Sequence, residues 1–375
     1  MGAALAFGLG RGLRRRLDCA EDPARREPMA LPTIGDLDRV RVGIQSWLRN
    51  LLDDAQGLVV APIDSPSASG ESSVTLLLDA HSPARGDERL VLRMVPEHSE
   101  VFAAHDLAMQ VDVLRALAAE GVPVPHVVGF ESDAGLLGSE FYVMEFVAGR
   151  IPPDNPPMAF GSWVTDDLDA DDRATMWRNG LEVLARIHAI DPSRHELGRL
   201  PRAAAGEPLV AAELRRFDPL FEPELRASAG ASVTEAWEFL CTHPPADGMR
   251  CLCWGDARVG NVIWRDNCPV AVLDWEMANL GDPRADLAWW VWIDKCTTEG
   301  LGLTLADGIP NPNDVYAQWS EMRGLPADGM EWFELFAAVR YAIILERKFR
   351  EMRARDPKMG EVPNFAATFV PGPLE

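Results

Sequence analysis

Hydrophobic and polar positions in the first part of the chain follow two spacings, one helical and one strand-like. Apolar residues recur on one face of two segments, which predicts amphipathic helices over Asp36–Leu52 and Leu107–Ala119. Three shorter runs have the pattern of strands: Val74–Asp79, Leu90–Val95 and Phe141–Phe146. We therefore expect a small N-terminal lobe built around a sheet.

The rest of the chain has mainly helical spacing, interrupted by short strands. One predicted helix carries an apolar stripe from Trp177 to His188, so we interpret His188 as a core residue. Three strand-like runs surround tight loops: Cys251–Trp254, Val262–Trp264 and Val270–Leu273. A buried helix is predicted over Asp286–Asp294, and we interpret its tryptophans as core packing.

These patterns divide the chain into four segments. We expect a disordered tail over 1–32, an N-lobe over 33–146, a C-lobe over 147–356 and a loose C-terminal segment over 357–375. The fold class that follows is α+β.

Composition and charge exclude several classes of protein. The 375 residues are 47% hydrophobic and 25% charged, as in a globular protein. With 58 acidic and 36 basic residues the net charge is −22, which argues against a nucleic-acid-binding protein. No apolar run is long enough for a membrane span, and the N-terminal apolar stretch precedes its arginines, the reverse of a secretory signal. The six cysteines form no CxxC pair, so we expect a cytoplasmic protein with reduced thiols.

The segment with the clearest chemistry combines two carboxylates and an amide. Asp256 follows a predicted strand on a tight loop, Asn261 comes five residues later, and Asp274 ends another strand. Phosphoryl transfer needs a carboxylate to orient the attacking hydroxyl and hard oxygen ligands for magnesium. We assign Asp256 to the first role and the other two residues to the second. The alternative is that each polar residue only caps a turn, and the three together outweigh it.

At these residues the chain resembles the aminoglycoside phosphotransferase family, a branch of the protein-kinase-like fold. GDARVGN (255–261) and AVLDWEMANLGDPRADLAW (271–289) are similar to the family's catalytic loop, metal-binding strand and following helix. The resemblance spans about residues 36–350. It implies a two-lobed fold, with a small antiparallel-sheet N-lobe, a larger mainly helical C-lobe, and ATP between them.

The resemblance also implies roles for individual residues. Asp256 would be the catalytic base, and Arg258 would face the transferring phosphate. Asn261 and Asp274 would bind Mg²⁺, and Asp286 would support the catalytic loop from behind.

The same resemblance implies a nucleotide site in the N-lobe. The loop between the first two strands would cover the nucleotide through Ser69, Gly70, Ser72 and Ser73. Arg93 would contact the α- and β-phosphates, with Gln110 on its partner helix. The backbones of Glu145 and Val147 would meet adenine.

Three positions depart from the family pattern. Trp254 stands where histidine is usual, Arg93 where lysine is usual, and Gln110 where a glutamate would pair with that cation. The last two favour an alternative function, a non-catalytic nucleotide-binding pseudokinase that acts as a sensor or scaffold. The intact set of Asp256, Asn261 and Asp274 favours an enzyme.

The acceptor is the part of the function that the sequence leaves open. The acidic run over 166–172 either caps a helix or forms a rim that attracts a cationic acceptor. Glu276 is a second candidate for contact with the acceptor. We predict an ATP- and Mg²⁺-dependent small-molecule kinase whose acceptor hydroxyl belongs to an aminoglycoside or an endogenous metabolite.

Overall fold

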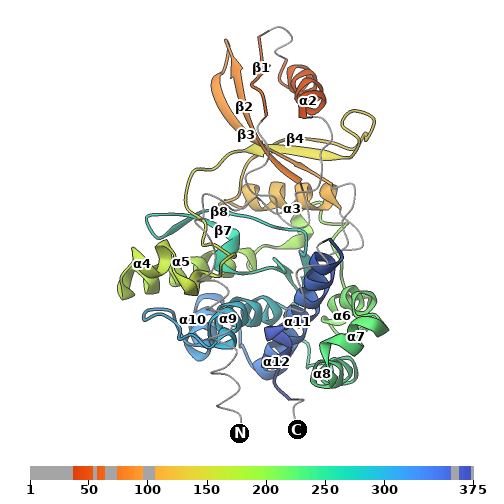
Figure 1. The fold of residues 1–375 in the computed structure, drawn as a ribbon, viewed down its shortest axis with the longest axis vertical. Coiled ribbons are helices and arrows are strands. Elements are labelled where there is room, and N and C mark those ends of the chain that lie inside the picture. Colours follow the sequence, from red (N-terminus) through yellow and green to blue (C-terminus); the bar gives the residue numbers. More distant parts are fainter. Residues whose placement is uncertain (1–36, 54–56, 64–73, 96–105, 356–362, 373–375) are drawn as a thin grey trace. The chain divides into compact units, whose positions relative to one another are not determined.

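The computed structural model describes residues 37–53, 57–63, 74–95, 106–355 and 363–372. The chain divides into two compact units at Ala148 and Gly149, called here the N-terminal and C-terminal units. Figure 1 shows most of the strands in the first unit and most of the helices in the second. The tail over 1–32 and the serine- and glycine-containing loop over 69–73 lie outside the described residues.

A five-stranded antiparallel sheet forms the centre of the N-terminal unit, in the order β1-β2-β3-β5-β4. Buried side chains alternate with more exposed ones along the second strand, as expected when one face covers a core. In the strand register, Arg93 of β3 pairs with Thr75 of β2 on one side and with Tyr142 of β5 on the other. The strands are β1 (Val59–Val60), β2 (Val74–Ser82), β3 (Gly86–Met94), β4 (Val127–Glu131) and β5 (Phe141–Glu145).

Two helices accompany this sheet, α2 (Leu37–Leu51) and α3 (Leu107–Ala119). The apolar face of α2 shares one core cluster with β2, β3 and β5 through Val40, Ile44 and Leu48. Helix α3 begins after Asp106, whose carboxylate accepts a hydrogen bond from the Met109 amide over 2.8 Å, a typical N-cap. It contacts β4 and β5.

The C-terminal unit is mainly helical. Its helices α9 and α11 lie side by side and contribute much of the buried core (Figure 1). The helices are α4 (Trp163–Asp166), α5 (Ala170–Ile187), α6 (Ala211–Phe217), α7 (Pro223–Ala229), α8 (Ala231–Thr242), α9 (Arg284–Thr298), α10 (Pro312–Arg323), α11 (Met330–Arg355) and α12 (Phe365–Phe369).

Two short antiparallel strand pairs hold the loops that carry the candidate chemistry. Asp266 and Asn267 join β7 to β8 with φ angles of 50° and 57°, as a type I′ turn requires. The pairs are β6 (Cys251–Cys253) with β9 (Asn279–Gly281), and β7 (Val262–Arg265) with β8 (Cys268–Val272).

The predicted α+β fold, with a small antiparallel sheet and a larger helical part, is confirmed. Within the segment over 357–375, for which a loose conformation is expected, the described residues include α12. The Asn364 side chain caps this helix at Ala367 and also donates to the Ala342 carbonyl and to Glu346 of α11. No described helix combines the length and apolar character needed to cross a membrane.

Candidate functional site

Asp256 lies on the loop after β6, where three side chains of the same unit surround its carboxylate. Trp289 Nε1 donates a hydrogen bond to Oδ1 over 2.6 Å, and Asn261 Nδ2 donates to Oδ2 over 2.6 Å. Arg258 Nε lies 3.3 Å from the same Oδ2. The Asp256 side chain is 17% exposed, so its orientation is fixed while solvent still reaches it.

Arg258 is a cation stabilised by nearby carboxylates. Its guanidinium forms ion pairs with Asp154 and Asp256. Burial works against the charge, but Asp256, Asp154 and Asp274 together raise the pKa of Arg258 above its ordinary value. A permanent positive charge therefore lies beside Asp256, where it could meet a phosphate group.

Asn261 and Asp274 offer oxygen atoms suited to magnesium. Asn261 uses Nδ2 to bind the carbonyl and carboxylate oxygens of Asp256, which leaves Oδ1 as the ligand atom of its amide. Asp274 follows β8 with a φ angle of 63°, a left-handed conformation that is uncommon outside glycine. The Leu273 amide donates to the Asn261 carbonyl over 2.9 Å, so the segment that leads to Asp274 lies next to the loop that carries Asn261, and the Asp274 charge contributes to the raised pKa of Arg258. Carboxylate and amide oxygens are ligands that Mg²⁺ prefers, and these residues therefore fit the ion.

The sharp turn before Asp256 requires glycine. Gly255 has a φ angle of 86°, and a Cβ atom at this position would lie 2.1 Å from the Met277 carbonyl oxygen. The close approach of these two backbone segments brings the loop next to the chain that follows Asp274.

Asp286, near the start of α9, binds the loop from the interior. Its Oδ2 accepts hydrogen bonds from the Trp254 amide (2.7 Å) and from His188 Nε2 (3.0 Å). Its Oδ1 accepts from the Gly255 amide over 2.8 Å. Asp286 is 1% exposed, so each lost bond would leave a buried polar group without a partner.

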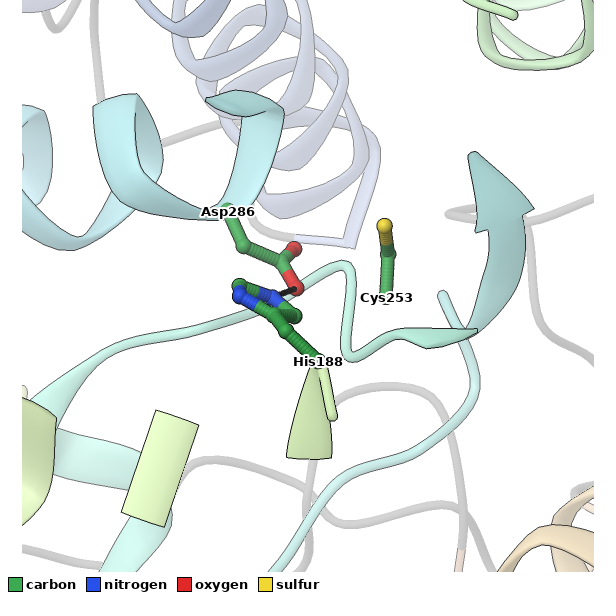
Figure 2. A group of neighbouring side chains, drawn as sticks. All are labelled: His188, Cys253 and Asp286. Carbon is green, nitrogen blue, oxygen red and sulfur yellow. Dashed lines mark hydrogen bonds and ion pairs between the residues drawn. The ribbon is translucent and has the colours of Figure 1, made fainter. Parts of the chain in front are cut away.

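His188, Cys253 and Asp286 form a buried group whose potential ligand atoms all lie within 4.8 Å of one another (Figure 2). Trp319 Nε1 can only donate, so His188 Nδ1 accepts from it and Nε2 carries the proton toward Asp286. Burial raises the pKa of the Cys253 thiol well above its usual value. Both imidazole nitrogens are therefore engaged and the thiol is protonated, which favours structural support over metal binding.

Comparison with known proteins places these residues in a family. The family model of the phosphotransferase enzyme family matches residues 66–326. The chain belongs to this family. Acyl-CoA dehydrogenase family member 11 of Rattus norvegicus is 28% identical over 272 residues, which cover 70% of this chain and 33% of that protein. The chain thus spans about a quarter to a third of the length of the curated relatives it matches.

Solved phosphotransferase structures share the fold. A candidate aminoglycoside phosphotransferase from Ralstonia eutropha has a TM-score of 0.65 at 21% identity, with 87% of this chain and 93% of that chain covered. An aminoglycoside phosphotransferase in complex with GDP and kanamycin has a TM-score of 0.54 at 16% identity, with 84% and 94% covered. The resemblance proposed from the sequence and the prediction of a phosphotransferase are confirmed.

Trp254, which departs from the family's usual histidine, makes contacts that a smaller imidazole would not reproduce. Its indole N–H donates to the carbonyl oxygens of Leu273 (2.8 Å) and Asp274 (3.1 Å). Its ring lies 5.6 Å from that of Trp275. Trp254 therefore ties the loop that carries Asp256 to the segment that carries Asp274.

The residues predicted to bind nucleotide belong to the N-terminal unit. Arg93 is half-buried on β3, and Tyr142, its strand partner, donates to the buried Gln110 side chain over 3.5 Å. The Glu145 amide donates to the His126 carbonyl, while the Glu145 side chain is exposed. Val147 follows on the segment after β5. The four predicted loop residues lie outside the described part of the chain: Ser69, Gly70, Ser72 and Ser73.

The acidic run over 166–172 makes the contacts expected of structural residues. Asp169 caps α5 by accepting from the Asp172 amide, and Asp167 pairs with Arg150 over 2.6 Å. These contacts favour the helix-capping interpretation over an acidic rim. Glu276 is half-buried after Asp274, and its backbone carbonyl accepts from Arg216 over 3.3 Å.

Two residues contact the Asp256 loop in a way that sequence patterns do not predict. Trp289 is buried as predicted, yet its indole N–H binds Asp256, so core packing does not describe it fully. Arg340, on α11, is fully buried and donates to the Gly255 carbonyl over 2.8 Å. Trp289 ends the segment 271–289 that carries the family resemblance, but the resemblance gives it no role. The sequence signal for Arg340 is an arginine inside an apolar helical run.

Proposed function

We propose that this protein is a kinase that uses ATP and Mg²⁺ to phosphorylate a hydroxyl group of a small endogenous metabolite. The observation that carries the proposal is the Asp256 carboxylate, held by Asn261 beside the Arg258 cation. Asp274 acts electrostatically on the same cation. A carboxylate, a cation and two oxygen ligands in one place are the parts that phosphoryl transfer uses.

Asp256 would orient the acceptor hydroxyl and accept its proton. The acceptor oxygen forms a bond to the γ-phosphorus as the bond from that phosphorus to the ADP oxygen breaks, and the hydroxyl proton passes to an Asp256 oxygen. Each carboxylate oxygen has further acceptor capacity beyond its present hydrogen bonds. Arg258 would stabilise negative charge on the transferring group, because its own charge persists at every physiological pH.

Asn261 Oδ1 and the Asp274 carboxylate would hold the magnesium ion. When bound, the ion neutralises negative charge on the phosphate oxygens. The protein's own contribution is orientation. Asn261 is fixed through Nδ2 to Asp256, and the left-handed backbone of Asp274 is held by the Trp254 indole.

The nucleotide would be bound by the N-terminal unit. The planar guanidinium of Arg93 carries a fixed positive charge and would donate two parallel hydrogen bonds to phosphate oxygens. The backbones of Glu145 and Val147 would contact the base. A neighbour of the same fold is a GDP complex, which supports nucleotide binding as a property of this architecture.

An endogenous metabolite is favoured as the acceptor over an aminoglycoside. The relatives are named as members of an acyl-CoA dehydrogenase family, and this chain matches about a third of the length of each. A similar unit therefore occurs within larger proteins whose names refer to metabolic enzymes. In the acidic run that could have attracted an aminoglycoside, Asp169 caps α5 and Asp167 pairs with Arg150.

The test is an ATP-consumption screen with purified protein. The panel holds aminoglycosides, sugars, amino alcohols and hydroxyacyl thioesters, the last chosen from the names of the relatives. Asp256→Asn should fold and bind ATP while turnover falls by roughly 10²–10⁴. Unchanged turnover in this variant would remove Asp256 from the mechanism. Mg²⁺-dependent ATP binding with no turnover on any acceptor would favour the pseudokinase alternative, which the departures at Arg93 and Gln110 support.

A further inference from the structure

We propose that Trp289 is a positioning residue that fixes the orientation of the Asp256 carboxylate, and that Arg340 holds Trp289 in place. This inference rests on the proposed function, because it assigns Asp256 to the transfer step. It adds one residue from α9 and one from α11, neither of which receives a role from the family resemblance.

Two hydrogen-bond donors, one to each carboxylate oxygen, determine the orientation of the Asp256 carboxylate. Trp289 Nε1 lies 2.6 Å from Oδ1, and Asn261 Nδ2 lies 2.6 Å from Oδ2. An aspartate side chain rotates easily about its last bond, since that torsion is broad. Both donors together remove this freedom, and a base that is correctly aligned before the acceptor arrives avoids the cost of ordering it later.

Arg340 holds both the indole and the loop backbone. Its guanidinium carbon lies 4.4 Å from the centre of the Trp289 ring, and its Nη2 donates to the Gly255 carbonyl over 2.8 Å. The Tyr341 ring meets Trp289 edge-on at 6.0 Å. One buried cation therefore fixes the side chain that binds Asp256 and the backbone that precedes it.

Helix α6 supplies the counter-charge for this cation. Glu213 Oε2 lies 3.6 Å from Arg340 Nη1, and both side chains are almost fully buried. Burial lowers the pKa of Arg340 while Glu213 opposes the shift. Arg216, one turn along α6, donates to the Met277 carbonyl over 2.8 Å, so the same helix also reaches the segment after Asp274.

The neighbouring tryptophans show that packing alone does not explain Trp289. The indole nitrogens of Trp290 and Trp292 have no hydrogen-bond partner among the described residues. Trp290 instead packs its ring against Gly180 of α5. Of these three buried indoles on one helix, only that of Trp289 meets the proposed base, and Trp290 offers a matched control.

The experiment compares Trp289→Phe with Trp290→Phe in the full-length protein. Both changes keep an aromatic ring, but only the first removes a hydrogen bond to a carboxylate. We expect kcat of Trp289→Phe to fall roughly tenfold or more, as loss of a bond to a charged group implies, with the KM for ATP unchanged. Trp290→Phe should retain the wild-type kcat. If no acceptor has been found, ATP hydrolysis with water as acceptor gives the rate.

A spectroscopic readout detects the contact independently of turnover. In ¹⁵N-labelled protein, the indole proton of Trp289 should resonate furthest downfield, because its bond to a carboxylate is short and charge-assisted. Asp256→Asn, which leaves Trp289 intact, should move this signal upfield. This measurement still tests whether Trp289 contacts Asp256 if Trp289→Phe does not fold.

The possible outcomes separate the two proposals. A wild-type protein without any transfer or hydrolysis contradicts the proposed function, and the indole signal then still shows whether the contact exists. An active wild type with equal kcat in both phenylalanine variants overturns the positioning role and leaves the proposed function standing. An indole spectrum that does not respond to Asp256→Asn also overturns it.

Discussion

Trp254 and Asp274 are joined by a hydrogen bond from the indole N–H to the Asp274 carbonyl, 3.1 Å long and shared with the Leu273 carbonyl at 2.8 Å. The bond connects the loop that carries the proposed base to the chain that carries a proposed magnesium ligand. Because Asp274 has a left-handed backbone, its conformation depends on such outside contacts. A tryptophan at this position is therefore compatible with an ordered site.

The first prediction concerns the turn before Asp256. Gly255→Ala should abolish activity and destabilise the protein, because its Cβ would lie 2.1 Å from the Met277 carbonyl oxygen. Gly206→Ala is the matched control, since Gly206 has nearly the same φ angle (85°) but nothing within 4 Å. It should cost about 1 kcal/mol and leave kcat unchanged. If Gly255→Ala and Gly206→Ala changed the free energy of unfolding in urea and kcat by equal amounts, the close approach of Gly255 to Met277 would be contradicted.

The second prediction concerns the buried support of the loop. Asp286→Asn should lower the free energy of unfolding by about 1–3 kcal/mol and reduce kcat, because an amide group would face backbone donors at Trp254 or Gly255. Chemical denaturation and steady-state kinetics measure the two effects. Asp171→Asn, on the exposed side of α5, should change neither. A fully stable Asp286→Asn protein would argue against this support.

The third prediction concerns magnesium. Asp274→Asn should raise the Mg²⁺ concentration for half-maximal turnover by roughly tenfold or more, because a charged ligand becomes neutral. Asp266→Asn is the control, since Asp266 also has a left-handed backbone (φ 50°) but lies in the turn between β7 and β8. Its Mg²⁺ dependence should match the wild type. The same Mg²⁺ requirement in all three proteins would exclude Asp274 as a ligand.

The fourth prediction concerns pH. Asp294 is 5% exposed beside a cavity of about 250 Å³, and burial raises its pKa to about 7, although hydrogen bonding from Trp177 opposes the shift. The native carboxyl thus keeps its proton between pH 4 and 7, where the unfolded chain has lost it. The protonated Asp294 carboxyl therefore contributes fully to the free energy of unfolding below pH 4, and this contribution is lost as the pH rises to about 7.

Asp294→Asn removes this titration and keeps an acceptor for Trp177. The variant should gain stability relative to the wild type as the pH increases from 4 to 8, by an amount on the order of a few kcal/mol. Urea denaturation at both pH values measures the difference. A difference that is independent of pH would contradict the raised pKa.

Much of the fold could be predicted because its segments have clear local periodicity. The helices α2, α3, α5 and α9 and the strands β2, β3, β5 and β6 agree with the apolar spacing of the sequence. Helix α11 is harder to recognise, since it is apolar on many sides and its burial comes from contacts with α7, α8, α9 and α12.

The sequence by itself determined the grouping of Asp256, Asn261 and Asp274. The first two lie five positions apart on one tight loop, and the third follows a strand that pairs with the strand beginning at Val262. Such short-range geometry depends on local turns and one hairpin, so the order of residues largely specifies it.

Only the tertiary structure decided which side chains support that group. Trp289 and Arg340 lie 33 and 85 residues from the loop positions they bind. Their contacts exist because α9 and α11 pack beside the loop, and no local spacing encodes the rotation of one packed helix against another. The sequence thus specifies the proposed reacting groups, while helix packing selects the donors that hold them.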